Sequence, residues 1–227
     1  MAVESVTQQD PDGAARHQRA DAARNRARLL EAATEMFRER GVEVGVGEIA
    51  DRAGVGRGTL FRNFPTKQEL VVAVIAHRMH EAIATGRALL DANTDKELLF
   101  PFMTEVIGRQ QQMDRGLFDV VAKDEFLNHP EMRSAHTQIA KVLDEMIAHD
   151  QRLGLVRDGI GAIDVLMLVK GACMVCSSFA EAGPDSLDRH LSLVWAAIAA
   201  PGRDLPLQGH IPTLADLRRS IGEPGGG

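Results

Sequence analysis

The sequence predicts an all-α protein in which a small N-terminal domain of three helices precedes a larger helical body. Apolar residues recur at helical spacing along most of the 227-residue chain. No segment shows the alternation of apolar and polar residues that a half-buried strand requires. Glycine and proline separate the helical segments from one another, as at Gly183-Pro184. These observations favour helix packed on helix throughout the chain.

Composition divides the chain into four parts. Residues 1–18 lack apolar periodicity, so we expect a disordered arm there. Residues 201–227 are rich in Pro and Gly and predict a flexible tail, with one short helix near Leu214–Ser220. Between these ends, residues 19–67 should form the N-terminal domain and residues 68–200 the helical body. The apolar fraction of 44% and the charged fraction of 26% are those of an ordinary globular protein.

The first helix of the N-terminal domain should run from about Ala20 to Arg40, where Gly41 ends it. One of its faces carries an apolar stripe made of Leu29, Leu30, Ala33, Met36 and Phe37. A shorter helix, from about Gly47 to Arg52, follows. The apolar stripe predicts that the longer helix supplies one side of a small core.

The segment from Ile49 to Lys67, IADRAGVGRGTLFRNFPTK, has the pattern of a helix-turn-helix. Its turn, Ala53-Gly54-Val55, contains the glycine that a tight turn between two helices favours. The second helix should span Arg57–Phe64, with Leu60 and Phe64 on its inward face. The second helix of such a motif can enter the major groove of DNA.

Pro65 ends this second helix, and a long helix begins directly after it. Thr66 and Glu69 have capping-box spacing, and an apolar stripe continues from Leu70 to about Leu90. The helix-turn-helix is therefore joined directly to a long helix of the body.

Charge is distributed unevenly along the chain. The whole sequence has a net charge of −6, which is unusual for a protein that binds nucleic acid. Residues 14–67, however, hold 11 Arg and Lys against 7 Asp and Glu, a balance of +4 that leaves −10 for the rest. A basic N-terminal unit on an acidic body favours DNA as the partner of the helix-turn-helix.

Side chains of the second helix supply the groups that DNA recognition uses. Arg57 stands at the helix N-terminus, where recognition helices contact base edges, and its guanidinium suits guanine. Phe61 offers apolar contact to a thymine methyl, Thr59 and Asn63 can bind phosphate, and Lys67 adds a positive charge at the next helix. The predicted DNA-binding residues are Arg57, Gly58, Thr59, Phe61, Arg62, Asn63 and Lys67. The alternative is an ordinary solvated helical hairpin.

The body should contain five further helices. The expected spans are about Asp95–Met113, Leu117–Lys123, Glu131–Leu153, Ala162–Ala182 and Leu187–Ala200. Asp95 should cap the first of these helices, and Pro101 fits only in its first turns or at a kink.

The N-terminal motifs carry a family resemblance. The segments ADAARNRARLLEAATEMFRERGVEV and GEIADRAGVGRGTLFRNFPTKQELVVAVI, over roughly residues 20–80, resemble the DNA-binding domain of the tetracycline-repressor (TetR) family of bacterial transcription regulators. The resemblance implies a homodimeric, ligand-responsive regulator, in most cases a repressor, that binds a palindromic operator and is released by a small-molecule effector. Gly56, Phe61 and Asn63 depart from the residues common in the family. These departures shift the expected base recognition onto Arg57.

Two further sets of residues follow from the resemblance. In the family, two C-terminal helices of each subunit form a four-helix dimer interface, and the last two helices here carry apolar surfaces wide enough for that role. The predicted interface residues are Val165, Leu168, Val169, Ala172, Leu191, Val194, Trp195 and Ile198. The predicted effector-pocket residues are Phe102, Met103, Ile107, Phe118, Phe126, His136, Met146, Met167 and Met174, with Phe100, Met113 and Met132 as further candidates. The pocket set equally describes a well-filled core, and a purely intramolecular core is the alternative for the interface set.

Other binding chemistry has little support in the sequence. Cys173 and Cys176 have the spacing of a redox or metal pair, but they lie in an apolar helix without a second pair, so we expect buried thiols. Two groups of neighbours on helix faces have side chains that bind metals: His77 with His80 and Glu81, and Glu125 with His129. We expect neither group to hold a metal.

No Ser-His-Asp order, phosphate-binding loop or dinucleotide fingerprint is present, so we expect neither an enzyme nor a bound cofactor. Two cysteines without a disulfide framework, and no signal-like N-terminus, indicate a reducing cytoplasm. Lys170 and Glu181 interrupt the longest apolar stretch, so no membrane span is expected. Two rival functions stay open: a metal- or thiol-dependent enzyme, and a helical module that binds protein.

Overall fold

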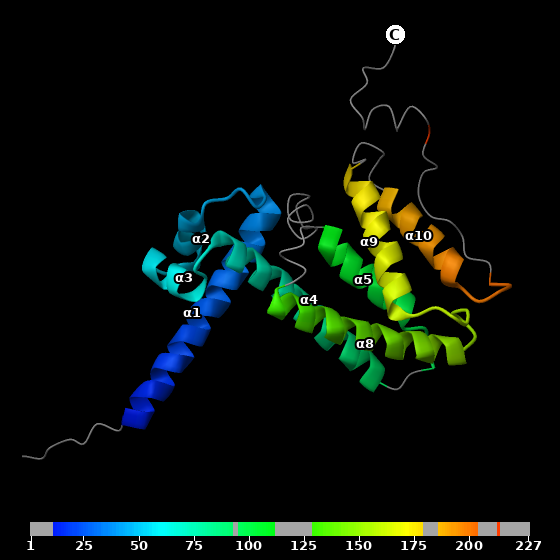
Figure 1. The fold of residues 1–227 in the computed structure, drawn as a ribbon, viewed down its shortest axis with the longest axis horizontal. Coiled ribbons are helices and arrows are strands. Elements are labelled where there is room, and N and C mark those ends of the chain that lie inside the picture. The colour runs from blue at the N-terminus through cyan, green and yellow to red at the C-terminus, as the bar shows by residue number, and fades with distance from the viewer. Residues whose placement is uncertain (1–10, 93–94, 112–128, 179–185, 204–212, 214–227) are drawn as a thin grey trace, which may run out of the picture. The chain divides into compact units, whose positions relative to one another are not determined.

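The computed structural model describes residues 11–92, 95–111, 129–178, 186–203 and 213, and within them the protein is helical. The helices are α1 (Pro11–Arg40), α2 (Val46–Ala53), α3 (Arg57–Asn63), α4 (Lys67–Asp91), α5 (Leu99–Gln111), α8 (Pro130–Arg152), α9 (Ala162–Ser178) and α10 (Ser186–Ile198) (Figure 1). The predicted all-α class is confirmed. The chain forms two compact units, residues 1–74 and residues 75–227, so the first two turns of α4 belong with the N-terminal unit.

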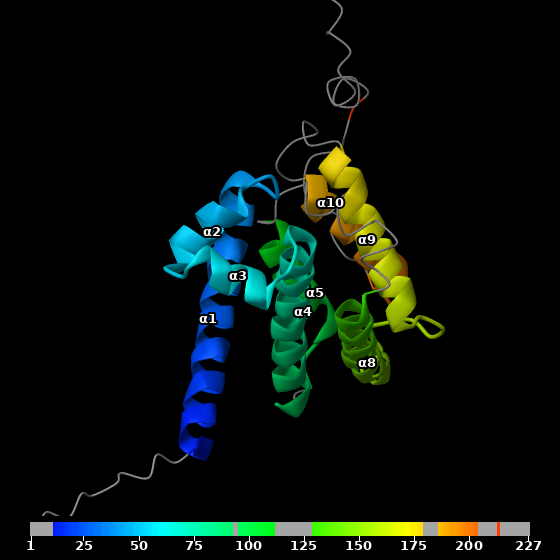
Figure 2. The ribbon, with the colours of Figure 1, turned by 60° about the vertical axis from the view of Figure 1, so that its left-hand side comes forward.

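The N-terminal unit packs α2 and α3 against the C-terminal half of α1 (Figure 2). Its core contains the predicted apolar stripe of α1 together with inward-facing side chains of the two short helices. These buried residues are Leu29, Leu30, Ala33, Met36, Phe37, Ile49, Ala50, Ala53, Leu60 and Phe64. The helical periodicity therefore identified the core of this unit correctly.

The first helix begins at Pro11 rather than near Ala20. The expectation of a disordered arm over residues 1–18 is therefore wrong for its second half, and residues 1–10 lie outside the described part of the chain. The physical reason is intrinsic propensity. The segment AARHQRADAARNRAR is dominated by Ala and Arg, which favour a helix without needing an apolar stripe. Proline at the first helical position is compatible with this start.

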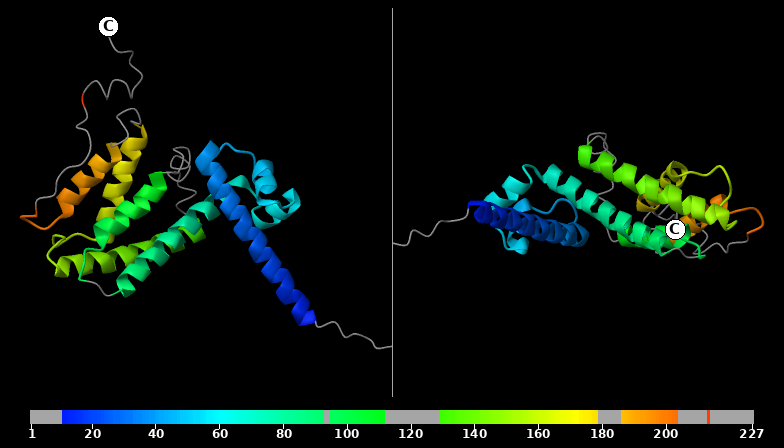
Figure 3. Two further views of the ribbon diagram at one scale, coloured as in Figure 1. Left: turned by 180° about the vertical axis from the view of Figure 1, so that it is seen from behind. Right: turned by 90° about the horizontal axis from the view of Figure 1, so that it is seen from below.

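The second unit is a bundle in which α9 packs against α10 and against α8, and α5 packs against α8 (Figures 1 and 3). Its core includes Leu99, Phe102, Val142, Leu143, Met146, Val165, Trp195 and Ile198. Gly86 on α4 allows close helix approach, because a Cβ there would lie 2.5 Å from Val142 Cγ1 and 3.2 Å from Phe102 Cε2. The Cα of Gly86 thus lies directly against the side chains of α8 and α5.

The start of α5 is capped from another helix. Asp150, on α8 and fully buried, accepts hydrogen bonds from the backbone N–H groups of Leu98 at 3.0 Å and Leu99 at 2.9 Å. The prediction that Asp95 caps this helix is wrong, because α5 begins only at Leu99 and its free N–H groups meet the carboxylate of α8. Pro101 lies in the first turn of α5, as its geometry requires.

Hydrogen bonds from neighbouring segments fix the start of α9 and the end of α10. Asp144 of α8 accepts a hydrogen bond from the N–H of Ala162 at 2.9 Å and so caps α9. Residues Val156 and Ala199 form an isolated antiparallel bridge, which ties the end of α10 to the segment after α8. None of the helices in the described part of the chain is long and apolar enough to cross a membrane.

The predicted tail is structured at its beginning. Arg203 makes an ion pair with Glu97, with 2.9 Å between Nη2 and Oε2, and its guanidinium carbon lies 5.9 Å from the centre of the Trp195 ring. Glu97 and Trp195 both belong to the body, so these contacts keep the chain on the body beyond Pro201. The predicted helices near Leu117–Lys123 and Leu214–Ser220 lie outside the described residues.

Candidate nucleic-acid interface

The turn between α2 and α3 is a Schellman motif centred on Gly54. Gly54 has a φ of +64°, a conformation that residues with a Cβ rarely adopt. Its N–H donates to the carbonyl of Asp51 at 3.1 Å, and the N–H of Val55 donates to the carbonyl of Ala50 at 3.0 Å. These two bonds satisfy carbonyls at the end of α2 and set the direction in which α3 begins.

The short helix α3 is amphipathic, and the sequence predicted its inward face correctly. Leu60 and Phe64 are each 1% exposed and face the core, whereas Phe61 is 48% exposed. Arg57, Gly58 and Arg62 are also exposed; Thr59, Asn63 and Lys67 are half-buried. A Cβ at Gly58 would meet no atom within 4 Å, so the backbone is open to solvent there. The predicted DNA-binding residues thus lie on or beside one accessible face.

The guanidinium group of Arg57 rests against α2. A Cβ at Gly47 would lie 2.7 Å from Nη2 and 2.8 Å from Cζ of Arg57, closer than real atoms approach. Only glycine at this position leaves room for the side chain in this orientation. Sequence reasoning missed the pairing because the two residues belong to different helices.

The other polar side chains of α3 bond within their own helix. Asn63 Nδ2 donates to the carbonyl of Thr59 at 2.8 Å. Arg62 donates from Nε to the carbonyl of Gly58 and from Nη2 to the Thr59 hydroxyl, both at 3.1 Å. These contacts hold the side chains of Arg62 and Thr59 against the helix surface. Arg57 and Phe61 make no such bond.

Two arginines of α1 and α2 are neutralised by carboxylates of the same unit. Arg52 pairs with Glu35 at 3.2 Å and with Glu39 at 3.0 Å. Arg40 pairs with Glu48, and this bond, followed by one from the N–H of Gly45, lowers the pKa of Glu48. By contrast, no ion pair joins the cations of the candidate interface to a carboxylate in the described residues; these cations are the exposed Arg57 and Arg62 and the half-buried Lys67. Their charge is available to a phosphate backbone.

Two arginines of α1 contact the turn and the end of α3 in the helix-turn-helix. Arg26 lies 4.5 Å above the centre of the Phe64 ring and donates to the carbonyl of Asn63 at 3.4 Å. Arg28 Nη2 lies 3.5 Å from the carbonyl oxygen of Gly54. The sequence offered only their positive charge and their place on α1, so this structural role was not predicted. Both side chains hold the ends of α3 and of the turn.

The first turn of α4 has the predicted cap. The hydroxyl of Thr66 accepts a hydrogen bond from the N–H of Glu69 at 3.1 Å. Lys67 is the first residue of the helix, beside backbone N–H groups that attract anions. The chain therefore places a positive charge and a helix N-terminus immediately after α3.

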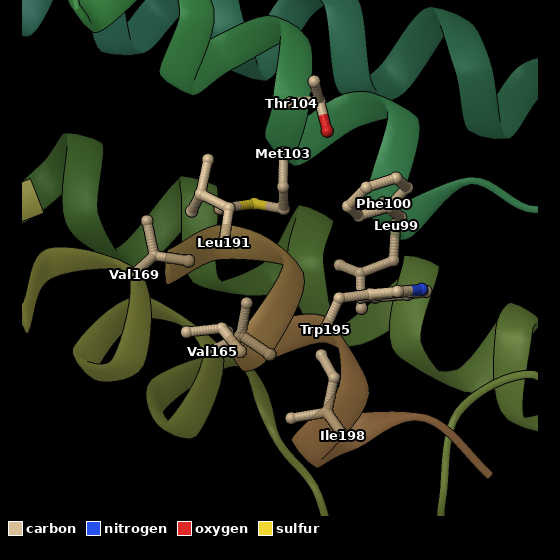
Figure 4. Close-up of a pocket in the computed structure, with 10 residues that line it drawn as sticks. Leu99, Phe100, Met103, Thr104, Val165, Val169, Leu191, Trp195 and Ile198 are labelled. Atoms are coloured by element: carbon tan, nitrogen blue, oxygen red, sulfur yellow. The ribbon is translucent and has the colours of Figure 1, made fainter. Parts of the chain in front are cut away.

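The predicted effector-pocket residues do not gather around one cavity. Met103 lines a small apolar cavity of about 20 Å³, room for about one water, between α5, α9 and α10 (Figure 4). Phe102 and Met146 are buried in the core, and Met167 is 70% exposed on α9, so it lines no interior space. His136 is half-buried, and desolvation lowers the pKa of its ring. Four positions, Ile107, Phe118, Phe126 and Met174, have no described side chain.

Most of the predicted dimer-interface residues face inward. The cavity in Figure 4 is lined by six of them, namely Val165, Val169, Leu191, Val194, Trp195 and Ile198. Ala172 is also buried, at 8% exposure, and Leu168 alone of the eight is exposed, at 41%. The buried members cannot contact a partner in this arrangement. The predicted interface stays a prediction, and α9 is apolar all round, which leaves helical spacing without a preferred face.

The remaining candidate groups are cysteines and histidines, and Glu125, the predicted neighbour of His129, lies outside the described residues. Cys173 is buried, and desolvation raises the pKa of its thiol to about 11; burial also raises the pKa of Cys176. His77 lies 3.8 Å from Glu81 on the exposed surface of α4, and the ring of His129 caps α8 by accepting from the N–H of Glu131. Within the described residues, no three His, Cys, Asp or Glu side chains are grouped to hold a metal.

The fold and the site together define a class of protein. A helix-turn-helix with an accessible face of arginine and aromatic side chains, continuous with a helical body, is the architecture of a DNA-binding transcription regulator. Residues 29–74 match the family model described as bacterial regulatory proteins, tetR family. Residues 94–199 match the model described as the C-terminal domain of SbtR-like transcriptional regulators.

Solved structures extend the similarity over most of the chain. The TetR transcription regulatory protein from Mycobacterium vanbaalenii is 35% identical, with a TM-score of 0.59, and the match covers 81% of this chain and 99% of that one. The chain therefore belongs to the TetR family, whose members are DNA-binding regulators rather than enzymes. The TetR transcriptional regulator SCO0520 from Streptomyces coelicolor is 24% identical, with a TM-score of 0.59. That match covers 78% of this chain and 99% of the SCO0520 chain, and it supports the fold alone.

Curated relatives match over shorter stretches. The transcriptional activator FasR of Mycolicibacterium smegmatis is 29% identical over 116 residues, which are 51% of this chain and 52% of that protein. An HTH-type transcriptional regulator of Staphylococcus aureus strain USA300 is 45% identical over 58 residues, 25% of this chain and 31% of its own. The chain thus spans about half the length of the first relative and less of the other.

Proposed function

We propose that the chain is a homodimeric repressor that binds a palindromic DNA operator and leaves it when a small-molecule effector binds the helical body. The observation that carries the DNA part is the accessible face of α3. There Arg57 and Phe61 are exposed, and Arg57 makes no ion pair with a described carboxylate. The family assignment supports the same function.

On this proposal α3 enters the major groove with its N-terminus toward the bases. Arg57 would bind guanine O6 and N7 with its guanidinium fork, and Phe61 would contact a thymine methyl. Gly58 carries no side chain, which permits close approach of a phosphate. Lys67 and the first N–H groups of α4 would bind the backbone beside it.

The proposed dimer forms through the exposed face of α9. Apolar side chains at helical spacing lie on this face, among them Ile163 at 61%, Met167 at 70% and Val175 at 44% exposure. Met167 also lines a shallow groove together with Gly159, Ile160, Asp164, Leu168 and Gly171. A second copy of the chain is the proposed occupant, because one recognition helix reads too few base pairs and two-fold pairing doubles the site. The half-sites would then lie ~34–36 Å apart or modestly further.

Effector release needs a ligand that binds two conformations with different affinity. α4 follows the recognition helix directly and continues into the core of the body, where Gly86 lies against α5 and α8. A ligand that changes the packing of α4 there would change the separation of the two recognition helices. This direct covalent connection supports the proposal.

Selection of duplexes from a random library should recover a palindrome, and two substitutions then test the assigned roles. Arg57→Ala should cost ~1–3 kcal/mol of operator affinity and relax preference at one base pair, whereas Lys67→Ala should weaken all sequences alike and reduce the salt slope by about 1. Arg38→Ala, which removes the same charge from the exposed surface of α1, is the control and should leave sequence preference unchanged. Wild-type binding by both interface variants would show that the assignment is wrong.

Activation of transcription is the second candidate, since one relative is named a transcriptional activator. Transcription in vitro from a promoter that carries the selected operator separates the two functions. A repressor lowers transcript yield in proportion to operator occupancy, and an activator raises it.

A further inference from the structure

The N-terminal part of α1 continues past the other helices of its unit. The helix begins at Pro11, and among its described side chains the first buried one is Leu29. We call residues 11–28 the α1 extension; at 1.5 Å per residue it spans about 27 Å. None of its described side chains, those of residues 20–28, is buried. Figures 1 and 2 show this dark blue end of the helix projecting beyond α2 and α3.

The order of packing along α1 places the extension next to α3. The C-terminal end of α1 meets α2, where Glu35 and Glu39 pair with Arg52. Nearer to the N-terminus, Arg26 donates to the carbonyl of Asn63, the last residue of α3. From the C-terminus of α1 toward its N-terminus, α2 therefore comes first, α3 second and the extension last. A ligand on the exposed face of α3 that continues past α3 in this direction meets the extension.

The extension carries an excess of positive charge. It holds five Arg and no Lys against two Asp and no Glu, a balance of +3. Arg24 pairs with Asp21, but both side chains are exposed, and an exposed pair contributes little. The segment contains no Val, Leu, Ile, Met or aromatic residue. A membrane surface requires an apolar helix face, which is missing here, whereas a phosphate backbone requires only cations.

The length of the extension suits a DNA duplex. The major groove of B-DNA is about 12 Å wide, so a helix of about 27 Å that passes α3 reaches beyond the edge of the groove that α3 would occupy. The phosphates of the backbone lie at that edge. Arginine is well suited to them, because its guanidinium group can bind phosphate oxygens with two parallel hydrogen bonds.

We propose that the α1 extension is a second DNA-binding surface, which contacts the phosphate backbone of the duplex flanking the half-site that α3 binds. Arg16, Arg19 and Arg24 supply the positive charge, and the helix holds their backbone positions at fixed spacing. Phosphate contacts carry no sequence information directly, so this surface adds affinity without changing the preferred operator. The inference rests on the proposed function, because it takes α3 as the helix that positions the DNA.

Two duplexes with the same selected palindrome test the inference on the full chain. One duplex ends at the edges of the palindrome, and the other continues for about 8 base pairs of random sequence on each side, the length of about 27 Å of duplex. Wild-type protein should bind the longer duplex at least about tenfold more tightly at low salt. Its plot of log K against log salt should be steeper by about 0.9 for each phosphate contact that the flanks add.

A triple variant of the extension should lose this gain. Arg16→Gln, Arg19→Gln and Arg24→Gln together remove three positive charges, and glutamine keeps a high helix propensity. Affinity for the short duplex and the selected palindrome should stay close to those of the wild type. The matched control removes three positive charges from exposed positions of α8, by Arg133→Gln, Lys141→Gln and Arg152→Gln. It should keep the full gain from the flanks.

A separate variant tests whether the helix itself is required. Ala22→Pro keeps every charge, but proline removes a backbone hydrogen bond and clashes with the carbonyl four residues earlier, so it breaks or kinks the extension at an exposed position. Most of the gain from the flanks should disappear. A gain equal to that of the wild type would overturn the proposal that a continuous helix presents these arginines.

Equal affinity and equal salt slope of wild-type protein on the two duplexes would overturn the inference and leave the proposed function intact. This result does not depend on the folding of any variant, which circular dichroism checks. A gain that survives in the triple variant of the extension, or that the α8 control also loses, would overturn the inference as well. Protein that binds neither duplex would refute the proposed function, and the inference with it.

Discussion

At the scale of single residues, the position of Arg57 depends on a glycine ten residues earlier in the chain. The guanidinium lies where the Cβ of any other residue at position 47 would stand. The atoms displaced by such a Cβ are the far end of a flexible side chain, so the fold itself should tolerate the change. We therefore expect a Cβ at position 47 to affect DNA recognition rather than the stability of the fold.

We therefore expect Gly47→Ala to lower operator affinity toward the value of Arg57→Ala while leaving the free energy of unfolding equal or slightly higher, by up to about 1 kcal/mol. Fluorescence anisotropy with the selected operator measures the affinity. In an Arg57→Ala background the same change should have no further effect, because the two residues act as one unit. Additive losses would show that Gly47 acts independently of Arg57.

Asp150 is a second residue with a specific structural role. Its buried carboxylate caps α5, and desolvation raises its pKa, an effect that the N–H groups of Leu99 and Leu98 partly offset. Glu97 also raises this pKa and His149 lowers it. A carboxyl group with a raised folded-state pKa binds its proton more readily when folded than when unfolded. Its contribution to stability is therefore greatest at low pH and is lost as pH rises through the folded-state pKa.

Asp150→Asn should destabilise the protein by ~1–3 kcal/mol at neutral pH, because the amide directs donors at the N–H groups of α5. The wild-type advantage over the variant should grow as pH falls from the raised pKa toward the ordinary value of 3.8. Urea denaturation of both proteins at a series of pH values measures this difference. An advantage that shrinks on acidification would contradict the direction of the pKa shift.

At the scale of elements, the orientation of α3 depends on the left-handed residue that precedes it. Gly54 ends α2 with a φ of +64°, and its carbonyl accepts from Arg28 of α1. Gly58, one turn later, sits inside a helix with open space around it. The two glycines have opposite conformational requirements although they lie in the same motif.

Alanine at these two positions should therefore change stability in opposite directions. Gly54→Ala should destabilise by ~1–2 kcal/mol because a Cβ disfavours the left-handed conformation. Gly58→Ala should stabilise by about 0.5–1 kcal/mol because alanine restricts the unfolded chain and favours the helix. Chemical denaturation followed by circular dichroism measures both. Equal effects at the two positions would show that backbone conformation does not govern this turn.

At the scale of the whole molecule, the proposed dimer depends on which face of α9 is left outside the core. Val165 lies on the inward face of α9, which lines the cavity and packs in the core. Met167, on the same helix, is 70% exposed. Burial of an unpaired charge at a dimer interface is strongly unfavourable. A charge placed at position 167 should thus separate the subunits and leave each of them folded.

We expect Met167→Glu to raise the dimer dissociation constant by several orders of magnitude, equivalent to ~3–5 kcal/mol, and to abolish tight binding to the full palindrome. Gln138→Glu makes the same change of charge on the exposed surface of α8 and should leave the dimer intact. Sedimentation velocity across a concentration series measures the assembly. A dimer of unchanged strength in Met167→Glu would place the interface elsewhere.

The sequence by itself determined the helix-turn-helix, because its signals are local. Gly54 for the turn, Leu60 and Phe64 at one-turn spacing, and Thr66 before Glu69 all act within a few residues of the structure that they specify. Their combination also carried the family resemblance. Contacts between residues that are far apart in the sequence were decided only by the tertiary structure.

Three features show this limit. Asp150 caps α5 across 52 residues, so Asp95 was the nearest candidate that the sequence offered. Met167 and Val165 are equally apolar, and only the packing of α9 on its neighbours separates the exposed side chain from the buried one. Arg203 pairs with Glu97 at 2.9 Å and lies 5.9 Å from the centre of the Trp195 ring, because residues far apart in the sequence converge there. Local patterns specify which helices form, and the faces that those helices bury depend on partners that no short pattern contains.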